Sequence, residues 1–467
     1  MPSIDAAAVT RVRISPSAFA VAVIVSGTVF CGVASADTMI VGYPENTSST
    51  TGVTNIELRP RYAIVQQEGK EEAKAGTVRA MVGYATPQAD GIGVTLELIG
   101  VGALNSAGYN VPVEPLPSGS NPAHATILDP EAFNANQAYV SYDGIGGTRI
   151  LAGRQLIELD DQRFVGNVGF RQNMQTYDGI SVVNRGLPDF KVMGTYLFGA
   201  KSVLNNEVRM KTFLAEASWT RYGAVRVNVF GYWYGNRENA YGAATTGNAA
   251  IIPGAALCGA GANSANSLVD PQACNSATYG ARVHGNFPLT GIWRGSYAAE
   301  YAHQSAWDGG YGALGSGFDH LSVTVRGADV YVSADAMRMG ANASGTYGFQ
   351  TPMATKHNFM GWAEMFLTTP KEGLRSHYVT LGDKRLWGFD MSVRYYRFTT
   401  DYQGMGLGHE WDWSIGHALT RNTRFVFQVA KFSVDAAGAS SYADLQAGAP
   451  GGLENTTAAW GMLTAAF

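Results

Sequence analysis

The chain has 467 residues, of which 46% are hydrophobic and 15% charged, with 33 Lys and Arg against 37 Asp and Glu. A net charge of −4 excludes the basic surface that nucleic-acid-binding proteins use on phosphates. Beyond the N-terminal region, no uninterrupted apolar run is long enough for a membrane-spanning helix, although Gly (57 residues) and aromatic residues (11%) are abundant.

The N-terminal region has the pattern of a secretory signal peptide. Arg11 and Arg13 precede an apolar stretch over 18–33, and the small residues of 34–36 form a cleavage pattern. We therefore predict that residues 1–36 are removed and that a single domain, residues 37–467, enters an oxidising compartment outside the inner membrane.

The mature region alternates apolar and polar residues with period two, as in strands that have one apolar face. Val225, Val227 and Val229, for example, alternate with Arg226 and Asn228. The pattern predicts eighteen strands near 55–66, 76–86, 91–103, 135–144, 148–158, 174–185, 189–202, 212–222, 224–236, 276–288, 292–306, 318–327, 329–340, 374–383, 387–400, 408–418, 422–434 and 455–467. Alternation alone is also compatible with a soluble sandwich.

The lengths of the connections separate these two folds. Tight connections and long connections alternate along the chain, so they collect at opposite ends of the strands. Short periplasmic turns and long outer loops are typical of outer-membrane barrels, and a sandwich has no reason to sort them. The fold class predicted is an all-β transmembrane antiparallel barrel, with long outer loops over 104–134, 159–173, 237–275, 341–373 and 435–454.

Charged residues on the face opposite the apolar one are expected to line the pore, because an Arg or Lys facing lipid costs roughly 2–4 kcal/mol near the midplane. One interpretation is a set of Arg–carboxylate pairs that keeps a wide barrel from collapsing. The other is an anion-selective cluster, since local arginine excess attracts anionic solutes. The candidate cluster comprises Arg59, Arg61, Arg79, Arg154, Arg163 and Arg171. Strict alternation would instead point Arg154 at lipid, unless Gly153 hosts a bulge or the strand ends there.

An acidic group lies beside one of these arginines. Glu158, Asp160 and Asp161 are dense in the hard oxygen ligands that calcium prefers, but Arg163 nearby favours internal ion pairs over a metal site. We predict no metal and no cofactor.

The two cysteines of the mature chain fall in one long loop. In an oxidising compartment Cys258 and Cys274 are expected to form a disulfide, worth about 3 kcal/mol in the chain-entropy model. Two free thiols are the alternative.

The segment 357–374 is long for a simple loop. Trp362, Phe366 and Leu367 have a spacing that one or two helical turns would place on one side. The segment therefore either folds into the pore as a lid or packs among the outer loops.

The chain ends on Phe467, an aromatic residue suited to the interfacial girdle of a barrel. We expect its strand to pair with the strand that contains Ile56, Leu58 and Tyr62, and Trp460 to face the pore.

Several blocks together resemble the alginate export family of outer-membrane β-barrels. The blocks are Asn136-Gln137-Ala138-Tyr139-Val140, Gly153-Arg154-Gln155, residues 160–166, 170–173 and 175–179, and Gly361-Trp362-Ala363-Glu364-Met365-Phe366-Leu367. The resemblance implies an eighteen-stranded monomeric barrel with an electropositive pore that inward-folded loops constrict.

The function expected is an outer-membrane porin for passive diffusion of small anionic or polar solutes, surrounded by lipid and lipopolysaccharide. The alternatives are an export channel for an anionic polysaccharide such as alginate, or a sleeve for a periplasmic partner protein. Nucleic acid is not an expected partner. The serine-hydrolase elbow, the His-Glu-x-x-His zinc motif and the phosphate-binding loop are absent, so no enzymatic activity is predicted.

Overall fold

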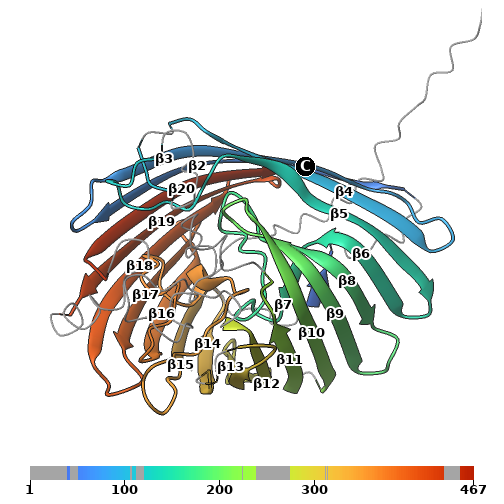
Figure 1. The fold of residues 1–467 in the computed structure, drawn as a ribbon. Coiled ribbons are helices and arrows are strands. Elements are labelled where there is room, and N and C mark those ends of the chain that lie inside the picture. The colour runs from blue at the N-terminus through green and yellow to red at the C-terminus, as the bar shows by residue number, and fades with distance from the viewer. Residues whose placement is uncertain are drawn as a thin grey trace, which may run out of the picture.

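The wall of the molecule is a closed antiparallel barrel. The computed structural model describes residues 39–42, 51–105, 108–111, 120–222, 225–237, 274–310, 312, 314–435 and 453–467. Eighteen of the strands in these ranges form the barrel (Figure 1). They are β2 (Val53–Gln67), β3 (Ala73–Ala85), β4 (Ile92–Ala103), β5 (Ala132–Ile145), β6 (Thr148–Gln155), β8 (Thr176–Asn184), β9 (Phe190–Lys201), β10 (Glu207–Tyr222), β11 (Val225–Tyr234), β12 (Ser276–Pro288), β13 (Arg294–Ala306), β14 (Ser316–Arg326), β15 (Val330–Met339), β16 (Leu374–Leu386), β17 (Phe389–Thr399), β18 (Gly406–Ala418), β19 (Thr423–Val434) and β20 (Thr456–Ala466).

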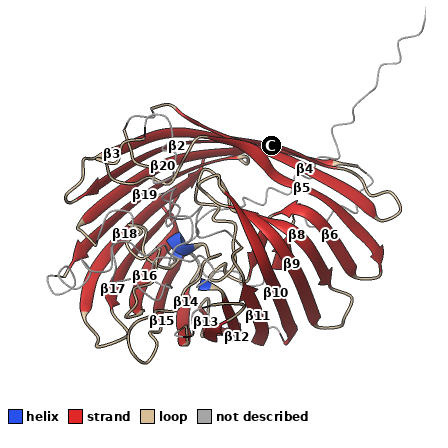
Figure 2. Cartoon of the chain, in the orientation of Figure 1, coloured by secondary structure: helices blue, strands red, loops and turns tan. Residues whose placement is uncertain are grey.

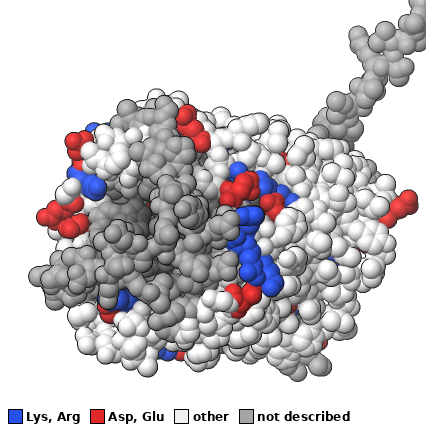
Figure 3. All heavy atoms as spheres, in the orientation of Figure 1, with Lys and Arg blue, Asp and Glu red and all other residues white. Residues whose placement is uncertain are grey.

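Side chains alternate across this wall with apolar residues outside. On β2, Ile56 and Leu58 are 44% and 47% exposed, while Glu57 and Arg59 between them are buried inside the ring. On the face drawn in Figure 3, uncharged atoms cover most of the described surface and the charged atoms gather in a few groups. An apolar outer face on every strand is the arrangement that hydrocarbon surroundings require.

The predicted strands all exist, with one difference near the middle of the first half. The predicted strand 148–158 leaves the wall after Gln155, and Ile157–Leu159 forms a separate strand, β7. β7 pairs inside the barrel with β1 (Met39–Val41), a strand that the alternation pattern did not predict. A three-residue strand gives too short a periodic signal to be recognised from the sequence.

The barrel closes where expected. β20 pairs with β19 on one side and with β2 on the other. The main chains of Phe467 and Ile56 exchange two hydrogen bonds, at 2.8 and 3.0 Å. Trp460 is buried in the interior, as predicted from the period of the last strand.

Two long connections fold into the ring instead of standing outside it. They are the segment 156–175, between β6 and β8, and the segment 340–373, between β15 and β16; the second contains the short 3-10 helix η3 (Lys356–Asn358). Figure 2 draws helices in blue, among them the short η3 of the second segment. Main-chain hydrogen bonds join the two segments, from Gly166 N to Met353 O (2.9 Å) and from Thr355 N to Gln162 O (2.9 Å). We call the first the crossing loop and the second the lid loop.

The hydrophobic core therefore lies in the lumen. Phe170 of the crossing loop and Trp362 and Phe366 of the lid loop are buried against inward residues of the wall, among them Phe398 and Phe432. Of the two alternatives left open for 357–374, the structure shows the inward-folded one. None of the helical segments in the described ranges has the length and apolar character needed to cross a bilayer.

Some predictions fall outside the described ranges. The signal peptide over 1–36 lies outside them, as do most of 237–275 and most of 435–454. The cleavage of residues 1–36 stays a prediction.

Candidate functional site

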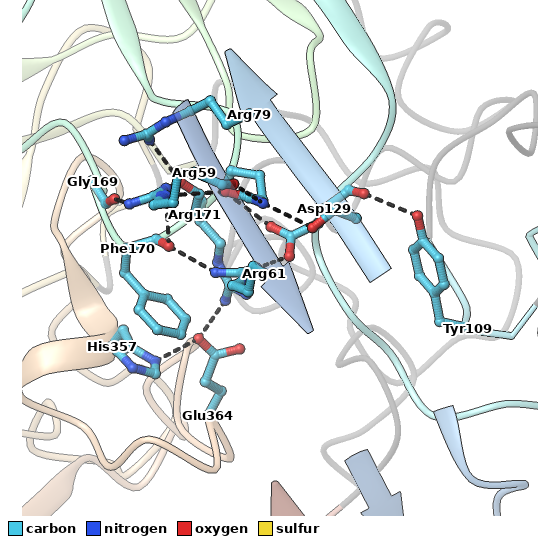
Figure 4. Close-up of polar contacts among 12 residues, drawn as sticks. Arg59, Arg61, Arg79, Tyr109, Asp129, Gly169, Phe170, Arg171, His357 and Glu364 are labelled. Atoms are coloured by element: carbon cyan, nitrogen blue, oxygen red, sulfur yellow. Dashed lines mark hydrogen bonds and ion pairs between the residues drawn. The ribbon is translucent and has the colours of Figure 1, made fainter. Parts of the chain in front are cut away.

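Three arginines on neighbouring strands face the lumen at one level of the wall. Arg59 and Arg61 lie on β2, and Arg79 lies opposite Arg59 on β3. Their side chains point inward because each stands between outward apolar residues, and all three are at most 4% exposed. Figure 4 shows them converging on the crossing loop. The predicted grouping of these three residues is confirmed.

The arginines bind the main chain of the crossing loop. Arg59 Nη1 donates to the carbonyl of Gly169 (2.9 Å) and Arg61 Nη1 to that of Phe170 (2.8 Å). Arg79 Nη1 donates to the carbonyl of Arg171 at 3.2 Å. The planar guanidinium, with several N–H donors, suits this role better than a lysine ammonium. The cluster thus holds the loop across the lumen as well as supplying charge.

Carboxylates neutralise much of the cluster. Glu57 accepts from Arg79 Nε at 2.9 Å, and Arg61 pairs with Asp129, which comes from the segment between β4 and β5. Within the described part of the chain, the arginine cluster of Arg59, Arg61, Arg79 and Arg171 meets three carboxylates, those of Glu57, Asp129 and Glu364. Four arginines thus meet three carboxylates. The ion pairs agree with the first interpretation from the sequence, and anion selectivity of the cluster stays a prediction.

Aromatic rings stand beside the arginine cluster. Phe170 stacks on His357 with centroids 3.5 Å apart, and the Trp362 ring is nearly parallel to His357 with centroids 6.0 Å apart. Trp460 of β20 meets Phe170 and His357 edge-on, at 5.6 Å each. The Arg61 guanidinium lies 5.0 Å from the Phe170 centroid, within cation–π range. Basic groups and flat apolar surface therefore occur together.

An ion pair connects the two loops. Glu364 of the lid loop pairs with Arg171 and accepts a hydrogen bond from His357 Nδ1 at 2.9 Å. Burial alone would raise the pKa of Glu364, but the Arg171 charge and the His357 hydrogen bond outweigh burial and lower this pKa to about 2. Burial lowers the pKa of His357, which keeps this imidazole neutral.

This ion pair should make the lid loop sensitive to acid. Because the pKa of Glu364 is lower in the folded protein than its ordinary 4.5, its contribution is complete above pH 4.5 and is lost as the pH falls toward 2. We expect the variance of the single-channel current to rise in that window, as Arg171 loses its partner. Glu364→Gln should show the higher variance at neutral pH with no further step in acid. The control Glu372→Gln, in the same loop, should keep the wild-type rise of current variance in acid. If this rise persists in Glu364→Gln, another titrating group causes it.

A second charged group lies across the ring. Asp161 lies 2.7 Å from Arg282 of β12 and 3.2 Å from Arg163, and Asp160 lies 3.1 Å from Arg282. Arg163 in turn lies 3.8 Å from Glu300 of β13. Of the three acidic residues singled out in the sequence, Asp161 pairs with Arg163, whereas Asp160 pairs with Arg282. From here on, the acidic group means Asp160, Asp161, Glu300 and the two arginines that they pair with, Arg163 and Arg282.

The crossing loop therefore spans the lumen between two walls. Its first half is held by β12 and β13 through the acidic group, and its second half by β2 and β3 through the arginine cluster. In the order of the barrel these strand pairs lie on opposite sides. Within the described residues the ion pairs of the first side join two arginines with three carboxylates, and those of the second side four arginines with three, so the arginine excess lies on the second side.

Glu158 lies on β7, within the crossing loop. It accepts hydrogen bonds from Asn167 Nδ2 (2.5 Å) and Gln162 Nε2 (3.0 Å), and it helps to shape the crossing loop. In the described ranges no three His, Cys, Asp or Glu side chains gather in a way that would hold a metal ion.

The prediction that Arg154 belongs to the pore cluster is wrong. It pairs with Asp178 of β8 at 2.7 Å and with Glu207 of β10 at 2.9 Å. Asp178 shares the parity of Ile180, which is exposed on the outer face, so Arg154 lies on the outside of the wall. Gly153 has a φ of 131°, yet the strand keeps its alternation through Arg154. Strict alternation was the better guide.

The structure describes only one of the two cysteines of the predicted disulfide. Cys274, just before β12, is disulfide-bonded. Cys258 lies outside the described residues, and its pairing with Cys274 stays a prediction.

Several residues of the site were not selected from the sequence. Asp129, Glu364 and Arg282 each pair with a selected arginine or aspartate, and His357 and Phe170 form the ring stack. Asp129 lies in the stretch 104–134, which the sequence analysis predicts to be an outer loop. The only available signal for Glu364 is its place within a segment already suspected of folding inward.

No protein-family model matches the sequence, and no curated protein matches it. The resemblance to the alginate export family therefore has no support from these comparisons.

Solved structures do match, at low sequence identity. OccAB4 of Acinetobacter baumannii superposes with a TM-score of 0.62 at 9% identity, over 90% of this chain and 99% of that one. OpdK of Pseudomonas aeruginosa, solved with vanillate, has a TM-score of 0.61 at 12% identity, over 89% and 98%. OccD3 (OpdP) of the same organism has a TM-score of 0.59 at 11% identity, over 92% and 95%. At this level the likeness concerns the fold, which is that of a porin-like barrel of eighteen strands.

Proposed function

We propose that the protein is an outer-membrane channel for passive diffusion of small anionic solutes, with carboxylates attached to flat apolar groups as the best-fitting class. The observation that carries the proposal is the arginine cluster beside the stacked rings of Phe170, His357 and Trp362, where two loops cross the lumen of a closed barrel. These groups are buried beneath the two loops, so they act on a passing anion through the net positive charge of the cluster and not by direct contact.

The polarised lumen supports the same reading. A solute anion between the two walls is attracted to the one that carries the arginine excess, so the field orients it as it passes. Because most of the arginine charge is already paired, binding stays weak enough for release. A channel needs this balance, since a solute held tightly does not leave.

The solved structures lend support by their fold and by what accompanies them. One of them, OpdK, is described as an outer membrane protein and was solved with vanillate, an aromatic carboxylate. The apolar exterior of the present barrel suits the same membrane, with lipid and lipopolysaccharide around it.

Solute uptake into liposomes tests the proposal. With the purified protein, we expect benzoate-sized carboxylates to enter faster than uncharged solutes of the same size, and the matching amines to enter slowest. Equal rates for the three classes would contradict an anion channel. The same preparation without protein is the control for leakage.

The polymer-export alternative gives a different result in the same system. An exporter is expected to stay closed in planar bilayers and to be blocked by short uronate oligomers at low concentration. Steady conductance without such block supports diffusion of small solutes, and a sleeve for a partner protein would conduct only when the partner is absent or displaced.

A further inference from the structure

Lys356 of the lid loop is a buried basic residue without a carboxylate partner. It lies in η3 and is 7% exposed, and its Nζ donates a hydrogen bond to the carbonyl of Leu367 in the same loop, at 2.6 Å. Among the described residues no acidic side chain pairs with this group. A buried ammonium group without a counter-ion is costly, so the position of the lid loop in this structure, which we call closed, is unfavourable for a charged Lys356.

The other basic residues of the two loops have acidic partners. Within the lid loop, His357 contacts Glu364 at 2.9 Å, and Lys371 is partly exposed and lies 3.7 Å from Glu372. The two arginines of the crossing loop form the ion pairs described above. Among the described basic residues of both loops, Lys356 is therefore the exception.

The elements that contact η3 and its flanks carry charges that do not compensate Lys356. Thr355 N donates to the carbonyl of Gln162 in the crossing loop, and Asn358 accepts from Arg394 of β17 at 3.0 Å. The titratable groups on these elements and on the neighbouring strand are Glu158 and Arg163 of the crossing loop, His357 and Glu364 of the lid loop, Tyr378 of β16, and Arg394 and Tyr396 of β17. Burial alone lowers the pKa of Lys356 to about 7, with no contribution from these groups.

Polar contacts hold the closed lid loop in place against this cost. The ion pair between the two loops is one of them. The main-chain N–H of Ala363 donates to Glu410 of β18 at 2.8 Å, and Arg394 donates to the carbonyl of Asn358. The closed position therefore reflects a balance, in which a change in the energy of Lys356 shifts the loop toward or away from the wall.

We propose that Lys356 is the residue through which an anionic solute opens the lid loop: its ammonium group leaves the apolar interior and pairs with the carboxylate of the solute when the loop lifts. The inference rests on the proposed function as an anion channel and adds a regulation to it. A solute shifts the loop only by its difference in affinity for the two positions. The ammonium group is available to the solute in the lifted position and is shielded in the closed one, so the solute favours the lifted position.

Protonation of Lys356 should act in the same direction as the solute. Because its pKa of about 7 in the closed position is below the ordinary 10.5, the contribution of Lys356 to that position is greatest above pH 10.5, declines as the pH falls to about 7, and is constant below. Openings should therefore become more frequent as the pH falls from 10.5 to 7. The effect of Glu364 lies below pH 4.5, so the two windows do not overlap.

Two substitutions of Lys356 separate its charge from its titration. Lys356→Met keeps a long unbranched side chain and removes the charge. Lys356→Arg keeps the charge but does not titrate in this pH range. The matched control is Lys371→Met, which removes the same charge from a partly exposed position of the same loop.

The measurement is the open probability of single channels in planar bilayers at pH 8, with sodium benzoate replacing sodium chloride at equal ionic strength. In the wild type and in Lys371→Met we expect benzoate to raise the open probability about fivefold, at the lower end of the usual coupling between two sites. Uncharged benzamide should have no effect. Lys356→Met should lose both the benzoate response and the pH response between 10.5 and 7, whereas Lys356→Arg should keep the first and lose the second.

The outcomes distinguish this proposal from the channel proposal on which it rests. A benzoate response that persists in Lys356→Met, or an equal loss in Lys371→Met, would overturn the role of Lys356. The reversal potential of every variant should equal that of the wild type, because the arginine cluster is unchanged, and it also shows that the variant has folded. Anion preference without opening by benzoate would contradict the role of Lys356 and leave the channel proposal standing. A wild type without anion preference would contradict the channel proposal, and with it this one.

Discussion

Replacing Arg59, Arg61 and Arg79 together with serine is expected to change the channel from anion preference to cation preference. The triple change removes three positive charges and leaves Glu57 and Asp129, which now pair with these arginines, as free negative charges at the same level of the lumen. In a tenfold salt gradient the reversal potential should move toward the cation side by about 30 mV, roughly half of the ~59 mV that perfect selectivity for a monovalent ion gives. Planar bilayer recordings measure it directly.

A second set of substitutions separates charge from loop anchoring. Lysine at the same three positions keeps the charge but loses the planar donors that reach the carbonyls of the crossing loop. The lysine variant should keep the reversal potential and show a noisier current. Arg154→Ser is the control for a single lost arginine on the outer face and should behave as the wild type. An unchanged reversal potential in the serine variant would show that the arginine cluster does not set selectivity.

Deleting 358–370 and closing the gap with a short Gly-Ser linker is expected to raise single-channel conductance at least about twofold. This stretch fills lumen that ions would otherwise use: Trp362 and Phe366 are fully buried, and Phe366 packs against Phe398 and Phe432 of the wall at 4.6 and 5.8 Å. The barrel strands on either side keep their pairing with neighbouring strands, so the wall should still assemble.

Smaller changes in the same loop should give graded results. Trp362→Ala removes one stacked ring and should raise conductance less than the deletion does. Glu364→Gln frees Arg171 without removing volume, and its effect should lie in current fluctuations instead of mean conductance. If the deletion left conductance unchanged, the crossing loop alone would define the narrowest point.

The wall could be predicted almost completely because a barrel strand follows a local rule. Each residue of a wall strand faces either outside or inside. The alternation of apolar and charged residues in a stretch such as 56–59 therefore indicates which face each side chain occupies, and all eighteen wall strands were predicted from this alternation. The same rule placed Trp460 inside. It also pointed Arg154 outward, and the attempt to bring that residue into the lumen through a bulge at Gly153 was the error.

The interior could be predicted only in part because its contacts join segments that are far apart in the sequence. Arg171 meets Glu364, and Arg163 meets Glu300, through the path of loops that have no periodic pattern. The sequence indicated which residues were charged and left two alternatives for the path of one loop, inside the lumen or among the outer loops. It gave no sign that a carboxylate at position 129 would be buried beside Arg61, since that stretch has the composition of an ordinary outer loop.

The pairing of the last wall strand with the first has a consequence for how the molecule assembles. The hydrogen bond between Glu68 and Asn455 joins residues 387 positions apart, so almost the entire chain must be in place before this seam can form. Until then two unpaired strand edges remain, which hydrocarbon does not tolerate. Contacts at such separation make folding slow and cooperative. A defect in any single wall strand should therefore lower the yield of assembled protein as a whole, and the arginine-bound loops can settle only into a ring that has already closed.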